Sequence, residues 1–211
     1  MSRYLKKSYL SLPRLCAYLE QYKYVNEGDR ILEVGKGSGV FGDIAKKIAD
    51  YTSIDIDKAT FPDIVASILD WKSLKEHAKN FDVIFCCQVL EHMPLEESKV
   101  ALNNLMKLEA KRIVISLPDN RTGIKLRIKL SKLDLRTVIT LPWSGANVNI
   151  TNNAEHHWEI GGDITRKLIS VFSRPCNGYR IVERYRLFER PKQHFFVYEQ
   201  QDQRRQEIVD T

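Results

Sequence analysis

The sequence predicts an α/β fold built on a doubly wound, mostly parallel sheet of seven strands, with an antiparallel last strand. Three observations support this prediction. Short apolar runs, typical of strands covered on both faces, alternate with segments of helical periodicity. A glycine-rich turn ends the first apolar run and opens a helix. The last two runs lie too close together around Pro191 for a helical crossover, so they must pair in antiparallel fashion.

Apolar runs and helical spacing place the individual elements. We expect strands over 31–34, 51–57, 63–70, 81–87, 112–117, 179–188 and 194–198. Apolar residues at helical spacing predict helices within 4–24 and over 41–48, 96–108 and 161–174. Pro13 could start the first helix or interrupt it. In the last two helices we expect these side chains to face inward: Val100, Leu102, Leu105, Met106, Ile164, Leu168, Ile169 and Val171.

Residues 121–140 fit two periods. Apolar and basic residues alternate over 124–130, which is typical of a strand. A helix is also fitted loosely by Ile124, Ile128, Leu135 and Val138. We expect a helical excursion from the sheet here.

The totals are those of one soluble domain, 1–211, with a helical cap over 1–27 and a frayed tail over 200–211. The net charge of +6 mildly favours an anionic partner. The four cysteines form no C-x-x-C pair, so we expect reduced thiols and no metal site. The chain has neither a signal-peptide core nor an apolar run that could span a bilayer, which predicts a cytoplasmic location.

The glycine turn indicates a nucleotide-type ligand, because glycines let the backbone approach it closely. Residues 37–42 formally match the G-x-G-x-x-G pattern of dinucleotide sites. In dinucleotide sites, however, the first glycine of the pattern comes directly after the strand, and the residue in that place in this chain is Gly35. Counted from Gly35, the pattern is acid-x-G-x-G-x-G, filled by Glu33, Gly35, Gly37 and Gly39. S-adenosylmethionine is cationic at its sulfonium and ammonium and has no pyrophosphate, so a carboxylate suits it. Asp55, at the end of the second strand, stands where a ribose-binding acid is expected.

Three segments together resemble the class I S-adenosylmethionine-dependent methyltransferases, and the resemblance covers most of the chain. Residues 31–39 resemble the first motif of that family, 53–57 its second, and 81–92, which end in Val-Leu-Glu-His, its fourth-strand motif. The resemblance implies a Rossmann-like methyltransferase fold. It also implies S-adenosylmethionine as cofactor, with S-adenosylhomocysteine as product.

The resemblance also implies roles for single residues. Asp55 would hold the ribose hydroxyls, and Ile56 would pack on the adenine. The family often has an acid near the adenine on the third strand, where this chain has Ser67, so either Ser67 or Asp70 is expected to take that role. Cys87 and Gln88 would lie near the methionine portion. The expected cofactor site is Glu33, Gly35, Lys36, Gly37, Gly39, Asp55, Ile56, Ser67, Ile68, Cys87 and Gln88.

A narrower resemblance concerns residues 62–65, 116–119, 155–161 and 194–197, which are similar to segments of bacterial methyltransferases of unassigned substrate. Proteins of that kind are often associated with cell-surface polysaccharide synthesis. This implies a small-molecule or carbohydrate acceptor, which could be anionic or lipid-linked.

The acceptor side is expected in an insertion over 118–160. A hydroxyl acceptor needs a base, and histidine is the commonest one. His157 and His156 are the first candidates, with either Glu155 or Glu159 to orient an imidazole, although the same residues could simply close a loop. Trp158 could stack on a sugar ring or fill the core. His92, beyond the fourth strand, is a weaker candidate that could instead cap a helix.

We therefore predict an S-adenosylmethionine-dependent methyltransferase that transfers to oxygen of a small molecule or carbohydrate. The first alternative is an RNA or other nucleic-acid methyltransferase, for which the basic charge speaks. Against it, the Asp/Asn-Pro-Pro-aromatic motif of many base-modifying enzymes is missing after the fourth strand, which reads Cys-Gln-Val-Leu. A basic run within 121–132 could contact phosphates or lipid head groups, or could be a solvated face. The second alternative is a non-catalytic cofactor-binding scaffold.

Overall fold

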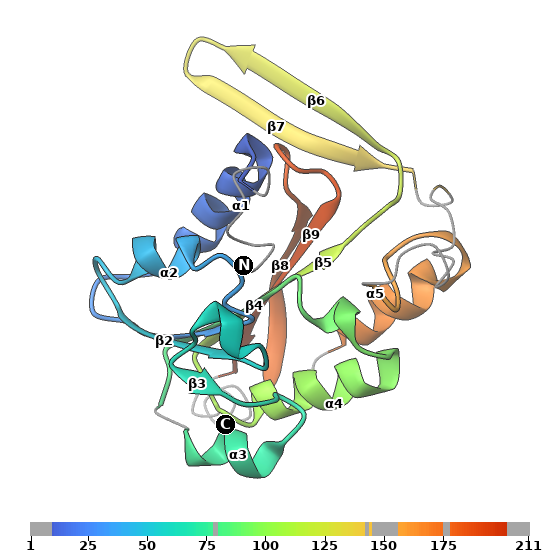
Figure 1. The fold of residues 1–211 in the computed structure, drawn as a ribbon. Helices are drawn as coiled ribbons and strands as arrows, with labels where there is room; N and C mark the ends of the chain where they lie inside the picture. The colour runs from blue at the N-terminus through green and yellow to red at the C-terminus, as the bar shows by residue number, and fades with distance from the viewer. Residues whose placement is uncertain (1–9, 78–79, 142–143, 145–155, 175–177, 202–211) are drawn as a thin grey trace, which may run out of the picture.

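The computed structural model describes residues 10–77, 80–141, 144, 156–174 and 178–201. A seven-stranded sheet with the order β3-β2-β1-β4-β5-β9-β8 forms its centre (Figure 1). The first five strands in sequence are parallel, and β9 is antiparallel to both of its neighbours. The predicted sheet is therefore confirmed. Its strands are β1 (Arg30–Val34), β2 (Asp50–Asp55), β3 (Ile64–Val65), β4 (Val83–Cys87), β5 (Arg112–Pro118), β8 (Tyr179–Arg186) and β9 (Gln193–Gln200).

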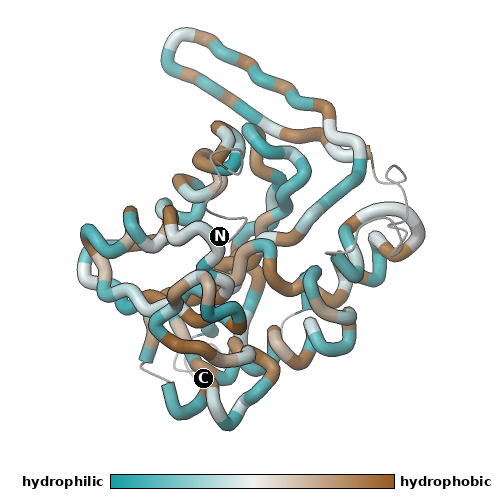
Figure 2. Tube along the Cα trace, viewed as in Figure 1, coloured by the Kyte–Doolittle hydropathy of each residue, from teal (hydrophilic) through white to brown (hydrophobic). Residues whose placement is uncertain are grey.

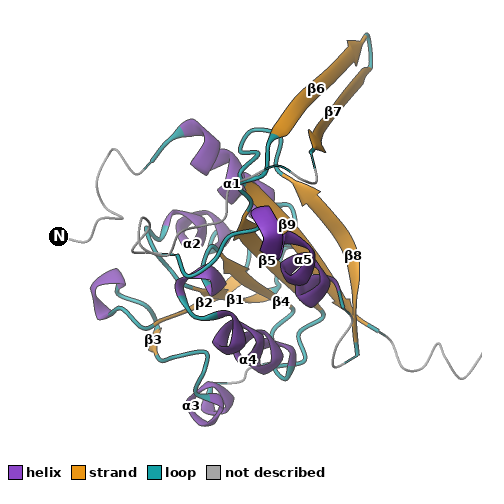
Figure 3. Ribbon diagram, turned by 90° about the vertical axis from the view of Figure 1, so that its right-hand side faces the viewer, coloured by secondary structure: helices purple, strands orange, loops and turns teal. Residues whose placement is uncertain are grey.

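Helices cover both faces of the sheet (Figures 1 and 3). One face carries α1 (Leu12–Tyr22) and α2 (Val40–Ala45), and the other carries α3 (Trp71–Glu76), α4 (Leu95–Met106) and α5 (Thr165–Ser173). Short 3₁₀ turns lie at Lys58–Thr60, Leu90–His92 and Gly162–Ile164. Pro13 lies in the first turn of α1, so it starts the helix and does not interrupt it.

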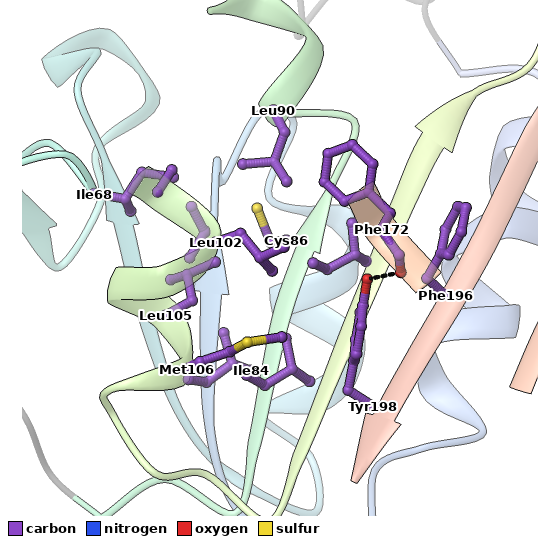
Figure 4. Close-up of a cluster of buried hydrophobic side chains, with 14 of the residues drawn as sticks. Ile68, Ile84, Cys86, Leu90, Leu102, Leu105, Met106, Phe172, Phe196 and Tyr198 are labelled. Atoms are coloured by element: carbon purple, nitrogen blue, oxygen red, sulfur yellow. Dashed lines mark hydrogen bonds between the residues drawn. The ribbon is translucent and has the colours of Figure 1, made fainter. Parts of the chain in front are cut away.

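The sheet has a hydrophobic core on each side, because successive side chains of a strand point to opposite faces. In β5, Ile113 and Ile115 belong to the core beneath α4, whereas Val114 belongs to the core beneath α1. Figure 4 shows the α4 side, where the Tyr198 hydroxyl donates a 2.6 Å hydrogen bond to the carbonyl of Phe172. Each fully buried aliphatic side chain contributes about 1.5–3 kcal/mol, so these two layers dominate the stability of the fold.

Several predicted details are wrong at the edges. The third strand is shorter than 63–70, because the Asp70 carboxylate accepts the backbone N–H groups of Lys72 and Ser73 and so begins α3. Val100 and Ile164 face solvent and not the core. The other predicted inward positions of α4 and α5 are buried or half-buried.

The predicted helical excursion over 121–140 is also wrong. The segment forms an antiparallel hairpin of β6 (Gly123–Leu130) and β7 (Leu133–Thr140), and its tight turn contains Ser131 with φ 39°. The colours along the hairpin in Figure 2 show the alternation of apolar and polar residues. This strand-like period, and not the loose helical one, determines the structure of the segment.

The hairpin projects from the body of the protein (Figures 1 and 3). Its polar face is tied to the β8–β9 turn, where Arg136 pairs with Glu189 at 2.9 Å and Lys125 lies over the ring of Phe188. Its apolar face is 41–63 % exposed at seven aliphatic positions: Ile124, Leu126, Ile128, Leu130, Leu133, Leu135 and Ile139. Among the described residues, no helix is both long and apolar enough to cross a bilayer.

Candidate active site at the carboxyl edge of the sheet

A cavity of ≈ 810 Å³ lies over the carboxyl ends of β1, β2 and β4, within the roughly 300–1,000 Å³ typical of small-molecule sites. Ligands of open α/β sheets bind at this edge. All of the predicted cofactor residues except Gly39 line the cavity. It is also lined by side chains that the sequence did not single out, among them Arg14, Tyr18, Gln21, Glu97, Arg190 and Gln193.

The glycine turn follows β1 and forms one wall of the cavity. Gly35 has φ +77°, and a Cβ atom there would lie 2.5 Å from Cγ2 of Val89. Gly39 has φ +74° and caps α2. Gly42 is needed for another reason, because a Cβ there would lie 2.5 Å from the ring of Tyr51. Gly42, which completes the formal dinucleotide pattern, is therefore explained by its packing against the ring of Tyr51.

Glu33 is the acid of the glycine turn, and its buried side chain lines the cavity. The Tyr51 hydroxyl donates a hydrogen bond to the Glu33 carboxylate. Burial raises the pKa of Glu33 to about 8, although the Tyr51 hydroxyl and the Lys36 ammonium oppose the rise. A cationic ligand at the turn would hold this carboxylate in its ionised form.

The end of β2 offers the surfaces expected for an adenosine. Asp55 lines the cavity, and one of its carboxylate oxygens accepts the backbone N–H of Asp57 at 2.9 Å. Ile56 also lines the cavity and is 74 % exposed. Of the two candidates for the adenine contact, Ser67 lines the cavity, whereas Asp70 is exposed and caps α3.

Gln88 follows β4 in a left-handed conformation, with φ 58°. Such a backbone costs about 1–2 kcal/mol for a residue with a Cβ, and strained positions cluster at functional sites. Its Nε2 atom is buried and has no hydrogen-bond partner among the described residues, although the residue lines the cavity. Next to it, burial raises the pKa of the Cys87 thiol to about 12, so this thiol stays neutral.

Helix α1 forms part of the cavity wall. The Tyr18 hydroxyl lies 2.9 Å from the Ser38 hydroxyl of the glycine turn, and Arg14 and Gln21 line the same space. Helix α1 therefore packs on the sheet and also contributes side chains to the cavity wall. Its spacing predicted the helix but not which of its side chains enter the cavity.

Of the three histidine candidates, His92 and His156 lie together at the cavity, and His157 does not. His92 and His156 line the cavity, with ring centroids 4.9 Å apart and an interplanar angle of 75°. Nδ1 of His156 lies 2.7 Å from a carboxylate oxygen of Glu159, as expected for an oriented imidazole. The His157 side chain is exposed and is not part of the cavity wall, and its backbone N–H donates to the carbonyl of Glu91 at 2.8 Å. The geometry therefore favours His156 over His157 as a group that meets the ligand.

Trp158 fills the core and is not free to stack on a sugar. It is 4 % exposed, its ring stacks on Phe172 at 5.5 Å, and its indole N–H donates to the carbonyl of Met93 at 3.1 Å. The segment that carries His156 is thus anchored on both sides, by the backbone of His157 and by the buried indole.

A buried ionic cluster supports the same segment from beneath. The Asp119 carboxylate is fully buried and accepts hydrogen bonds from Arg121, at 2.9 and 2.6 Å, and from His194 at 2.9 Å. Burial alone would raise the pKa of Asp119, but the hydrogen bonds and the charges of Arg121 and Arg186 lower it to about 2. Asp119 also forms a β-bridge with Ile160, so the cluster fixes the end of the histidine segment.

Comparisons with known proteins extend this description. No protein-family model matches the chain, and no curated protein is similar to it in sequence. The N-methyltransferase NodS from Bradyrhizobium japonicum WM9, solved with S-adenosylhomocysteine, has the same fold with a TM-score of 0.58 and 12% identity over 91% of this chain and 89% of that one. The 1,6-didemethyltoxoflavin-N1-methyltransferase of Burkholderia thailandensis matches with a TM-score of 0.59 and 11% identity over 90% and 79%.

A third structure carries a different name. A chain from Rhodobacter sphaeroides, described as a candidate Zn-dependent alcohol dehydrogenase, matches with a TM-score of 0.60 and 12% identity over 90% of each chain. At such identities a likeness establishes the fold and not the reaction. The chain has the Rossmann-like fold of class I methyltransferases, and the site itself must decide what the fold is used for.

Proposed function

We propose that this chain is an S-adenosylmethionine-dependent methyltransferase. The observation that carries the proposal is the position of Glu33, a buried carboxylate on the cavity wall beside Gly35. A buried carboxylate is stabilised by a cation and destabilised by a second anion. S-adenosylmethionine brings a sulfonium and an ammonium, whereas a dinucleotide brings a pyrophosphate. The acid therefore favours the former over the nicotinamide cofactor of a dehydrogenase.

The chain's own residues fit the parts of this cofactor. The turn from Gly35 to Gly37 and the Glu33 carboxylate would hold the methionine portion, with Gln88 Nε2 as a buried donor for a polar group. Asp55 would accept hydrogen bonds from the ribose hydroxyls, and Ile56 would cover the adenine. The bound cofactor supplies an activated methyl group, so the task of the protein is to align the acceptor with it.

For the acceptor we propose a small molecule or carbohydrate that is methylated at oxygen. Helix α1 forms part of the wall of the cavity and contacts the glycine turn, so a compact acceptor suits the site better than a duplex. Arg14 and Arg190 both line the cavity, which favours an anionic acceptor such as a sugar acid or a phosphorylated sugar. His156, oriented by Glu159, lies on the wall where the acceptor would enter.

Transfer of a labelled methyl group into fractionated cell extract tests this proposal. Label should enter the small-molecule, glycan or lipid-linked fraction, and the product should resist treatment with ribonuclease. Label in RNA, lost steeply as salt rises, would favour the nucleic-acid alternative. Tight cofactor binding with no transfer into any fraction would favour a scaffold.

Cofactor affinity is expected to rise with pH and to depend on Glu33. The pKa of Glu33 is about 8, because burial and the charge of Asp55 raise it by more than the Tyr51 hydroxyl and the charges of Lys36 and Lys46 lower it. Below this pH the group is protonated, and a cationic ligand must displace the proton. Affinity should therefore rise from pH 6 to pH 8, by up to about tenfold per pH unit.

Calorimetry with S-adenosylmethionine across this pH range measures the effect. Glu33→Gln keeps the shape of the side chain but removes the titration, so its affinity should be weaker at pH 8 and nearly flat with pH. An equal slope in both proteins would contradict the assignment of Glu33 to the cationic end of the cofactor.

A further inference from the structure

A cluster of three side chains lies on the acceptor side of the cavity. One potential ligand atom from each of Glu91, His92 and His156 lies within 4.8 Å of the others. Ligand atoms around a tetrahedral cation with bonds of about 2.0–2.1 Å lie roughly 3.3 Å apart, so small side-chain rotations would close the cluster on an ion. The cluster contains no cysteine and brings His156 to the distant Glu91 and His92, so the cysteine spacing gave no sign of it.

Glu91 supplies an independent observation. Its side chain is 0 % exposed, and neither carboxylate oxygen has a hydrogen-bond partner among the described residues. Burying a carboxylate without donors is strongly unfavourable, and native proteins normally pair such a group or use it to coordinate a metal. The imidazoles of His92 and His156 lie close to it.

The surroundings of His156 are those of a supported metal ligand. Its Nδ1 lies 2.7 Å from Glu159, and an Nδ1–H that donates to this carboxylate places the lone pair of the ring on Nε2. Metal-ligating histidines usually donate their second nitrogen to a carboxylate in this way. The His157 backbone N–H, bound to the Glu91 carbonyl at 2.8 Å, holds the two segments together.

We propose that Glu91, His92 and His156 bind one first-row divalent transition cation, such as Zn²⁺ or Mn²⁺, at the acceptor end of the cavity. Two imidazoles and one carboxylate suit these ions better than Mg²⁺ or Ca²⁺, which prefer oxygen ligands throughout. Three protein ligands leave a position open for an exogenous oxygen. The binding of the cation does not depend on which reaction the protein catalyses.

The functional consequence rests on the proposed methyltransferase activity. A cation beside the methyl donor would bind an oxygen of the acceptor and lower the pKa of its hydroxyl, whose proton then leaves to water. The cation, and not a free imidazole, would then activate the acceptor. An acceptor with two neighbouring oxygens, as in a sugar diol or a hydroxy acid, could use more than one open position.

Titration of the chelator-treated protein with Co²⁺ and Zn²⁺ alone tests the binding. We expect one cation per chain and a visible Co²⁺ absorption spectrum of nitrogen and oxygen ligands. Glu91→Gln and His156→Ala should each weaken binding at least tenfold, with melting temperatures measured in parallel. Because His156 lies in a loop, His156→Ala keeps the test open if Glu91→Gln unfolds. His77→Ala, a half-buried histidine outside the cluster, is the matched control and should bind as the original chain does.

Two results would overturn the metal site. One is cation binding no tighter in the original chain than in both cluster variants. The other is a Co²⁺–thiolate band, which would place the cation on Cys87, another residue of the cavity wall. Calorimetry with S-adenosylmethionine on the same samples separates the two proposals, since cofactor binding without cation binding removes the metal site and leaves the methyltransferase.

The activating role of the cation has its own test. If His156→Ala abolished turnover while chelators left turnover of the original chain unchanged, the imidazole would be a general base, and the activating role of the cation would be overturned.

Discussion

Gly35→Ala is expected to lower the affinity for S-adenosylmethionine on the order of 100-fold. Gly35 has φ +77°, where a residue with a Cβ costs about 1–2 kcal/mol, and its new methyl group would lie 2.5 Å from Cγ2 of Val89. Overpacking of this kind typically costs about 1–3 kcal/mol. The clash requires either the turn or the Val89 side chain to shift, and a shifted turn would no longer present its backbone to the proposed cofactor. Calorimetry gives the affinity, and urea unfolding gives the share of the loss that falls on stability.

Two control variants separate the causes. Gly28 also has a positive φ, of +79°, but a Cβ there would meet no atom within 4 Å, so Gly28→Ala should lower stability without changing affinity. Combining Gly35→Ala with Val89→Ala removes the clash and keeps the backbone strain, so it should restore part of the affinity. If Gly28→Ala weakened the cofactor as much as Gly35→Ala does, the close approach of the turn to the ligand would be the wrong explanation.

Asp119→Asn is expected to lower the free energy of unfolding by about 3–5 kcal/mol. The amide keeps the size of the side chain but leaves Arg121 buried without its bidentate partner and Arg186 without a nearby counter-charge. Asp119 also fixes the strand end that pairs with Ile160, so the His156 segment should loosen at the same time. Urea denaturation measures the first effect, and amide hydrogen exchange of residues 156–160 measures the second.

The same carboxyl gives the stability a pH dependence of known sign. Its pKa of about 2 in the folded protein lies below the unfolded value near 4, so its contribution is complete above pH 4 and is lost as the pH falls toward 2. The loss amounts to about 2 kcal/mol. Asp134→Asn is the matched control, because this carboxylate also pairs with two arginines but lies on the exposed hairpin, and it should change stability little. Similar losses in both variants would contradict the assigned role of burial.

The sheet and the glycine turn could be predicted because their signals are local. An apolar run followed by alternate glycines specifies both a buried strand and a tight turn, and most of the cavity lining follows from the parallel order of the strands. The hairpin over 123–140 was misjudged for a physical reason. Its apolar residues face solvent and do not pack on the core of the protein. The requirement to bury one face therefore did not help to choose between the strand-like period and the loose helical one.

The acceptor side could be predicted only in part, since it is assembled by tertiary contacts. Of the neighbouring residues His156 and His157, only His156 lines the cavity. The contacts of Trp158 and Asp119 anchor the segment and so determine which of the two histidines faces the cavity. The buried Glu91 belongs to a motif that the sequence displays, yet its lack of hydrogen-bond donors is visible only in three dimensions. Arg14 and Arg190 likewise meet in one cavity from opposite ends of the chain.

Calorimetry with S-adenosylmethionine, S-adenosylhomocysteine and NAD⁺ on the same preparation tests the central claim most directly. The position of Glu33 beside the glycine turn predicts one site per chain for each of the two sulfur compounds and no measurable heat with NAD⁺. Tight binding of NAD⁺, or no binding of either sulfur compound, would contradict the assignment of this cavity to a methyl donor.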